Sequence, residues 1–118
     1  MNNVAGTDEG GFNGPRGIAA DATYVYVADT LNHRLVRINA SSGAFAGWKG
    51  LITSTSGMSD ADCIAAGEGG ITPKWCTGGT SGPGRQLGAF DYPSGLFGDT
   101  HYIYVYDGRN NRIVTIPK

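Results

Sequence analysis

The chain has 118 residues, a net charge of −1 and 20 glycines, and only 16% of its residues are charged. This length suffices for one modest domain but not for two ordinary ones. The balanced charge argues against nucleic acid as a partner, and no apolar run approaches the roughly 20 residues that a membrane-spanning helix needs. The opening residues lack the basic and apolar regions of a signal peptide, but Met1 fits a native start as well as an added one, so export of the parent protein stays undecided.

A repeat with a spacing of 78 residues runs through the chain. Residues 15–38 align with residues 93–116 without a gap, and 11 of these 24 positions are identical. Unrelated segments of ordinary composition would share about one or two. Phe12 and Phe90 also align, each three residues before the proline that opens the aligned stretch. The repeat indicates two copies of one structural unit.

Each copy is expected to fold into short strands separated by turns. In the first copy we expect strands at 17–20, 24–28, 34–38 and 44–48. In the second copy we expect strands at 95–98, 102–106 and 112–116, without a fourth. A turn led by an aspartate, Asp21 or Asp99, follows the first strand of each copy.

The second strand of each copy decides the architecture. Residues 24–28 and 102–106 are dominated by β-branched and aromatic residues, which is typical of strands. They do not alternate between apolar and polar residues, so both of their faces need cover. The connections are too short to carry helices, so stacked sheets must supply the cover, and similar sheets stacked around an axis form a β-propeller. A β-sandwich, the alternative, would leave one face of each of these strands in water.

Short motifs recur at fixed places in the two copies. The first copy carries Phe12, Pro15–Ala19, Asp21, Tyr26–Asp29 and Asn32–Arg34. The second copy is looser, with Tyr104–Asp107 and Asn110–Arg112, and the opening Val4–Thr7 is similar to the end of a blade's outer strand. These motifs resemble those of the NHL-repeat family of β-propellers over about half of the chain. The resemblance implies an all-β fold with two four-stranded propeller blades per chain.

The chain is expected to be a single domain, 1–118, with three parts. Residues 1–49 form the first blade, with an N-terminal strand able to complete another blade; 50–88 are an insertion; and 89–118 form the second blade. The insertion is large, because a usual blade repeat spans about 40–45 residues. Loops this long inside a compact domain are usually functional or disordered.

Strand counting places the loops of both blades. The turns at 29–33 and 107–111 and the insertion share one face of the disc, which we call the loop face. We expect the loop face to recognise the partner.

The insertion contains both cysteines of the chain, Cys63 and Cys76. Two cysteines and two histidines without a CxxC motif make a structural zinc site a poor interpretation. A disulfide is favoured; it would close a loop of 13 residues, worth about 3 kcal/mol. A bridge would imply an oxidising compartment, whereas the alternative is two unpaired thiols in a cytosolic loop.

One set of polar turn residues recurs in both copies. Its members are Asp29, Asn32 and Arg34 in the first copy and Asp107, Asn110 and Arg112 in the second. Asp and Asn side chains bond neighbouring backbone groups in turns, and an arginine can pair with a carboxylate between blades. Because active sites are seldom duplicated, we expect these residues to be structural, and we expect no catalytic residue.

Aromatic and basic residues on the loop face are the candidates for ligand binding. They are Trp75, Tyr92, Tyr106, Arg109, His33 and Trp48. An exposed aromatic would stack on a sugar or anchor a protein ligand; the alternative for the two tryptophans is packing beneath the insertion. His33 and His101 occupy different positions of the repeat, so a channel metal would need one residue from each subunit of a ring. We therefore expect no metal and no cofactor.

Two blades cannot close a propeller, which typically has four to eight. Alone they would expose two apolar sheet faces, and a head-to-tail contact between chains removes both at once. We therefore expect a homo-oligomer, with a six-bladed homotrimer favoured over rings of two or four chains. The segment Asn2–Ala5, from the same chain or a neighbour, would then fill the edge left by the missing fourth strand.

The family resemblance bears on function. NHL propellers mostly act as platforms for proteins, RNA or carbohydrate, and a minority of relatives are lyases or lactonases with a metal in the channel. With the disulfide, this predicts a non-enzymatic recognition module at the cell surface or in the periplasm. Its ligand would be a glycan or a protein, and it would suit the tip of a trimeric fibre. The alternatives are a structural fragment of a larger NHL propeller and a metal-dependent enzyme of the lyase or lactonase type.

Overall fold

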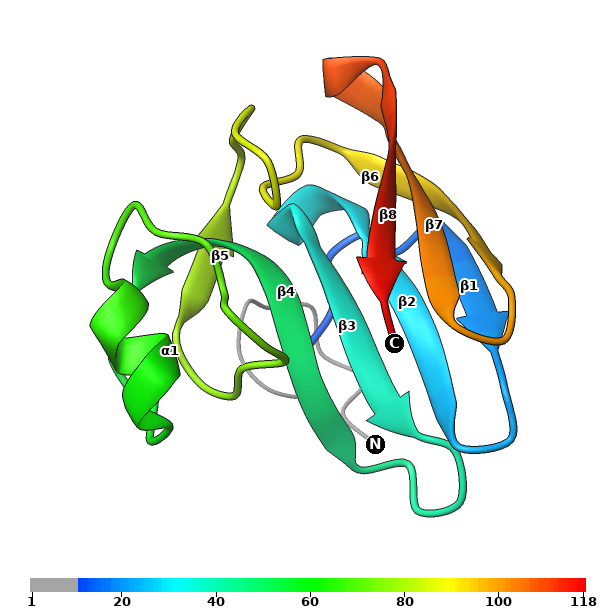
Figure 1. The fold of residues 1–118 in the computed structure, drawn as a ribbon, viewed down its shortest axis with the longest axis horizontal. Helices are drawn as coiled ribbons and strands as arrows, with labels where there is room; N and C mark the ends of the chain where they lie inside the picture. The colour runs from blue at the N-terminus through cyan, green and yellow to red at the C-terminus, as the bar shows by residue number, and fades with distance from the viewer. Residues whose placement is uncertain (1–10) are drawn as a thin grey trace.

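The computed structural model describes residues 11–118. Within this range the chain forms two antiparallel sheets, one short α-helix and two 3-10 turns (Figure 1). The first sheet contains, in order, β1 (Gly17–Ala20), β2 (Tyr24–Asp29), β3 (Arg34–Asn39), β4 (Phe45–Ser54) and β5 (Thr80–Gly82). The second contains β6 (Pro93–Gly98), β7 (Tyr102–Asp107) and β8 (Arg112–Pro117). The other elements are η1 (Thr30–Asn32), α1 (Ala61–Ala66) and η2 (Gly108–Asn110).

The all-β prediction is confirmed, and each expected strand is present within a few residues of its expected bounds. The strand numbers differ from two sets of four, because the described residues form a five-stranded and a three-stranded sheet. The first sheet is larger because the insertion returns to it: β5 pairs with β4 and keeps residues 50–54 extended. The predicted strand segments Asn2–Ala5 and Val4–Thr7 lie outside the described residues.

The turns led by aspartate have the expected geometry. Asp21 Oδ1 accepts the backbone N–H groups of Thr23 and Tyr24, each at 2.8 Å. Asp99 Oδ1 accepts those of His101 and Tyr102 at 2.9 and 2.8 Å. Because each carboxylate satisfies the turn's donors, β1 and β6 reverse tightly into the next strand.

The two sheets stack with β6 beside β1 and β2. Tyr26 and Leu35 of the first sheet are buried between the sheets. The second sheet covers them with Phe90, Ile103, Val105, Val114 and Ile116. The opposite face of the first sheet forms a second core from Val27, Val36, Ile38, Trp48 and Ile52. Both faces of β2 and β3 thus contribute to a core, which explains why β2 does not alternate in polarity.

The second sheet is covered on one face only. Along β7, Ile103 and Val105 are buried, whereas Tyr102 and Tyr106 are exposed. The composition of β7 therefore calls for cover that the described part of the chain does not supply.

The insertion packs along β4 rather than standing free over the loop face. The predicted Cys63–Cys76 disulfide is present, and Cys76 also exchanges backbone hydrogen bonds with Trp48 of β4. Asp60 caps α1 by accepting the N–H groups of Asp62 and Cys63. A disulfide is consistent with an oxidising compartment outside the cytoplasm. Among residues 11–118, no helix is long and apolar enough to cross a membrane.

Candidate functional site

A buried ion pair organises the turn between β2 and β3. The Asp29 carboxylate accepts hydrogen bonds from Arg34 Nε at 2.8 Å and Asn32 Nδ2 at 2.9 Å, and its other oxygen accepts the N–H of Asn13 at 2.8 Å. These three side chains are at most 3% exposed. Burial of charge is tolerated here because each charge is paired and hydrogen-bonded. The arginine pairs within its own sheet, whereas we had expected a contact between blades.

The second copy builds the same turn. Asp107 accepts hydrogen bonds from Arg112 Nε and Asn110 Nδ2, both at 2.9 Å, and from the N–H of Asp91 at 2.6 Å. Because the same bonds form twice, their geometry favours a scaffold role. Function is better sought where the two copies differ.

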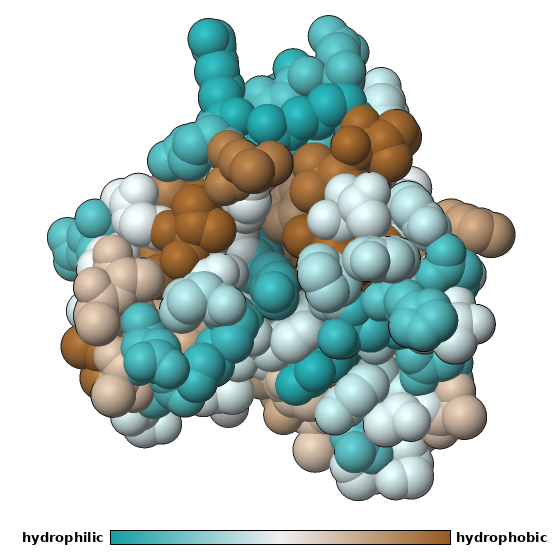
Figure 2. Space-filling model, viewed as in Figure 1, coloured by the Kyte–Doolittle hydropathy of each residue, from teal (hydrophilic) through white to brown (hydrophobic). Residues whose placement is uncertain are grey.

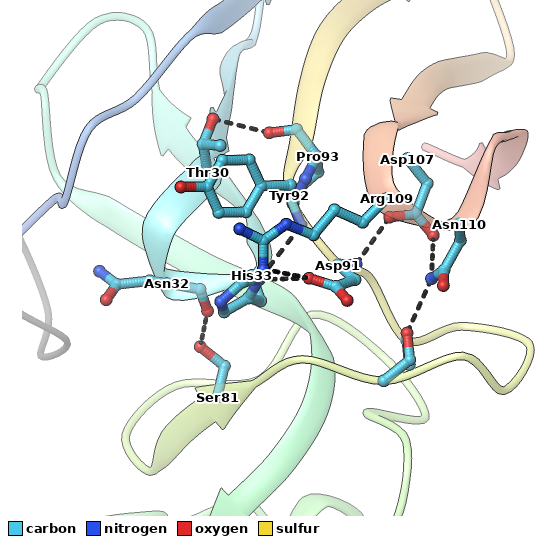
Figure 3. A network of polar contacts seen from close by, with 12 residues as sticks. Thr30, Asn32, His33, Ser81, Asp91, Tyr92, Pro93, Asp107, Arg109 and Asn110 are labelled. Carbon is cyan, nitrogen blue, oxygen red and sulfur yellow. Dashed lines mark hydrogen bonds and ion pairs between the residues drawn. The ribbon is translucent and has the colours of Figure 1, made fainter.

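The copies differ where their turns meet. Unlike pairs 78 residues apart are Asn13 and Asp91, Gly14 and Tyr92, Arg16 and Ser94, Leu31 and Arg109, and His33 and Asn111. The charged or aromatic member of each pair lies at the junction of the two sheets. We call Arg16, His33, Asp91, Tyr92 and Arg109 the seam cluster (Figure 3). Figure 2 shows the loop face, at the top, as strongly hydrophilic.

Tyr92 is the centre of the seam cluster. The Arg109 guanidinium lies 4.0 Å from the centre of the Tyr92 ring, and the Arg16 guanidinium lies 5.6 Å from it. The His33 ring is tilted against the same ring, with 5.9 Å between ring centres. Both arginines are within the range of cation–π attraction, about 6 Å. One aromatic ring therefore gathers two cations and an imidazole.

The backbone of Tyr92 is strained. Its φ is +62°, close to the +59° of Gly14 at the equivalent position of the first copy. A side chain in this conformation costs about 1–2 kcal/mol relative to glycine. The Tyr92 N–H donates to His33 Nδ1 at 3.1 Å, and the Tyr92 carbonyl accepts the N–H of Gly108 at 3.1 Å. Strain held by such bonds is typical of functional positions.

His33 is a neutral imidazole at this seam. Its Nδ1 accepts the Tyr92 N–H and so carries no proton of its own. Burial lowers the pKa of His33 below its ordinary 6.5, although the nearby Asp91 carboxylate opposes this shift. The cluster is therefore charged by its two arginines and by Asp91.

Asp91 presents an unsatisfied acceptor. Its Oδ1 is buried and accepts no hydrogen bond, although it lies 3.5 Å from His33 Nδ1 and 4.0 Å from Arg109 Nη1. His33 Nδ1 offers it no proton while that atom accepts from Tyr92. A buried acceptor without a donor costs about 1–3 kcal/mol, so a ligand hydroxyl that donated here would be bound favourably.

The six predicted ligand residues do not form one site. His33, Tyr92 and Arg109 belong to the seam cluster. Trp48 is 1% exposed and its indole N–H donates to the Gly78 carbonyl at 2.8 Å, so it lies in the core beneath the insertion. Tyr106 is exposed on the outer face of β7.

Trp75 lies apart, on the side of the first sheet that faces the second sheet. The Arg37 guanidinium lies 4.3 Å from the centre of the Tyr24 ring and 4.8 Å from that of Trp75. Lys49 approaches Trp75 at 5.6 Å, and burial, together with Arg37, lowers the pKa of Lys49. Trp75 is thus held in a cationic packing cluster, not at the seam.

Arg16 and Asp91 were not among the predicted ligand residues. Neither lies in a repeated motif, and the signal that could have found them is their departure from the repeat. Among residues 11–118, no group of three or more His, Cys, Asp or Glu side chains is arranged to hold a metal ion.

Comparison with known proteins adds no family. The chain matches no protein-family model, and no curated protein matches it. The geometry of the seam cluster must therefore carry the functional argument.

Proposed function

We propose that this protein is a non-enzymatic recognition module of the NHL-propeller type, which binds an extracellular glycan through the seam cluster. The observation that carries the proposal is the convergence of the copy-specific residues around Tyr92. The repeated scaffold supports them but does not include them. The disulfide supports an extracellular or periplasmic setting.

The chemistry of the cluster suits a sugar. Asp91 Oδ1 lacks a donor, and sugar hydroxyls donate hydrogen bonds. The arginines supply N–H donors for hydroxyl or carboxylate oxygens. Arg109 is well exposed, with 62% of its side chain accessible, so it is free to close on a ligand. The aromatic Tyr92 adds an apolar surface beside these polar groups, the combination found in small-ligand sites.

The repeat supplies substitutions for the test. Tyr92→Gly and Arg109→Leu place at the seam the residues of the equivalent first-copy positions, Gly14 and Leu31. Tyr92→Gly also relieves the positive φ, so it is expected to fold. Asn111→His is the matched control, because it adds a histidine at the equivalent turn of the second copy, away from the seam.

The experiment is binding of labelled protein to an array of neutral and acidic glycans. We expect wild type and Asn111→His to bind the same glycans, and the two seam variants to lose at least about tenfold in affinity, or 1.4 kcal/mol. An array on which the wild-type protein gives no signal, or a wild-type pattern from both seam variants, would refute the proposal.

A further inference from the structure

The outward faces of the two sheets carry the same residue pattern as their contact with each other. In the internal contact, the first sheet supplies Tyr24, Tyr26 and Leu35. Their equivalents 78 residues later are Tyr102, Tyr104 and Ile113, which lie on the outer face of the second sheet. Ile113 is 64% exposed there. We call this surface the donor face.

The other half of the internal contact is also repeated. The second sheet supplies Phe90, Leu96, Ile103, Val105 and Ile116 to it. Their equivalents in the first copy are Phe12, Ile18, Val25, Val27 and Ile38. These five residues line one apolar groove on the outer face of the first sheet, and Ile18 is 70% exposed. We call this surface the acceptor face.

We infer that the donor face of one chain packs into the acceptor face of a second copy, head to tail. The chain already contains the interface once, between its own sheets, and each outward face is the counterpart of one side of it. The donor face is also bulkier than its template, since Tyr106 stands where the internal contact has Ala28. The acceptor groove has a matching hollow of about 490 Å³.

Gly95 provides an independent sign of a neighbour. At the equivalent Gly17, an added Cβ would lie 1.7 Å from the Ser94 carbonyl oxygen, because β6 approaches β1 closely. At Gly95 the nearest atom would be Tyr106 Cβ, at an ordinary 3.6 Å. Nothing in the chain itself requires glycine there. A second copy would, because Arg16 occupies the position equivalent to Ser94.

Such a contact is heterologous, so it generates rings when the rotation closes. Three copies would place six sheets around an axis, within the range of four to eight for propellers. The interface would be mainly apolar: Thr30 donates to the Pro93 carbonyl across the internal contact at 2.7 Å, but its equivalent is Gly108, which has no side chain to donate.

The mass of the protein in solution, measured by sedimentation equilibrium, tests this inference. We expect the wild-type chain to form a closed species of several copies, three being favoured. Ile113→Asp and Ile18→Asp should each give monomers, and both should fold because these side chains are largely exposed within one chain. Gly95→Ala should also reduce assembly. Ile64→Asp, on α1 at the far edge of the first sheet from β1 (Figure 1), is the control and should assemble normally.

A mixing experiment separates this geometry from a face-to-face dimer. The Ile113→Asp chain keeps its acceptor face and the Ile18→Asp chain keeps its donor face. An equimolar mixture at high concentration should therefore give a 1:1 heterodimer and no larger species. A monomeric wild-type protein would overturn the inference. So would an oligomer that survives both substitutions, one broken by Ile64→Asp, or variants that fail to pair when mixed.

Discussion

At the scale of single residues, the charge of the seam depends on His33. Its pKa in the folded chain is lowered by burial, so the unfolded chain binds the imidazole proton at higher pH than the folded chain does. The free energy of unfolding should therefore fall as pH drops through the ordinary value of 6.5. This contribution is present at neutral pH and is lost in acid.

Replacement of His33 by asparagine should remove that part of the pH dependence. Asparagine stands at the equivalent turn of the second copy, Asn111, and both positions have positive φ, 55° and 49°. We expect urea denaturation between about pH 7.5 and pH 5 to show a shallower loss of stability for His33→Asn than for wild type. His101→Asn is the control. Identical slopes for His33→Asn and wild type would contradict the assignment.

At the scale of elements, the disulfide ties α1 to the strand edge of the first sheet. Cys63 lies in α1 and Cys76 pairs with Trp48 of β4. The bridge closes a loop of 13 residues, so its removal should lower the free energy of unfolding by about 3 kcal/mol. Denaturation of Cys63→Ala/Cys76→Ala with and without reductant measures this. The double variant should be insensitive to reductant, and a loss equal to that from reducing the wild type would confirm the cause.

The strands were predictable from sequence because each copy carries its own local signals. Asp21 and Asp99 mark the turns, and the β-branched and aromatic run of β7 marks a strand. The same signals were read twice, which guarded against a chance pattern. The repeat also identified the turn residues around Asp29 and Asp107 as scaffold.

The elements inside the insertion were not predictable in the same way. α1 has only six residues and stands in a glycine-rich segment, so no amphipathic period reveals it. β5 has three residues and exists because a distant strand edge is free to pair with it. Trp48 and Trp75 could not be told apart by composition, because their burial depends on how the insertion returns to β4. The seam cluster was found only in part for a similar reason: Asp91 becomes notable only once His33 is beside it.

At the scale of the whole molecule, the placement of the two sheets depends on how closely β6 can approach β1. Tyr26 and Leu35 reach the residues of the second sheet because no side chain separates the backbones at Gly17. The same position lies at the innermost strand of each blade in the proposed ring. Glycine there has a packing role, since its φ is not in the left-handed region.

Gly17→Ala should therefore separate the sheets. An alanine Cβ would meet the Ser94 carbonyl oxygen at 1.7 Å, a backbone atom that cannot rotate away, and overpacking of this kind costs about 1–3 kcal/mol. Gly95→Ala is the matched control, compared in chains that also carry Ile113→Asp so that assembly adds nothing to stability. In that background, thermal unfolding should show a large loss for Gly17→Ala and almost none for Gly95→Ala. Equal losses would mean that the close approach of β1 and β6 does not set the spacing of the sheets.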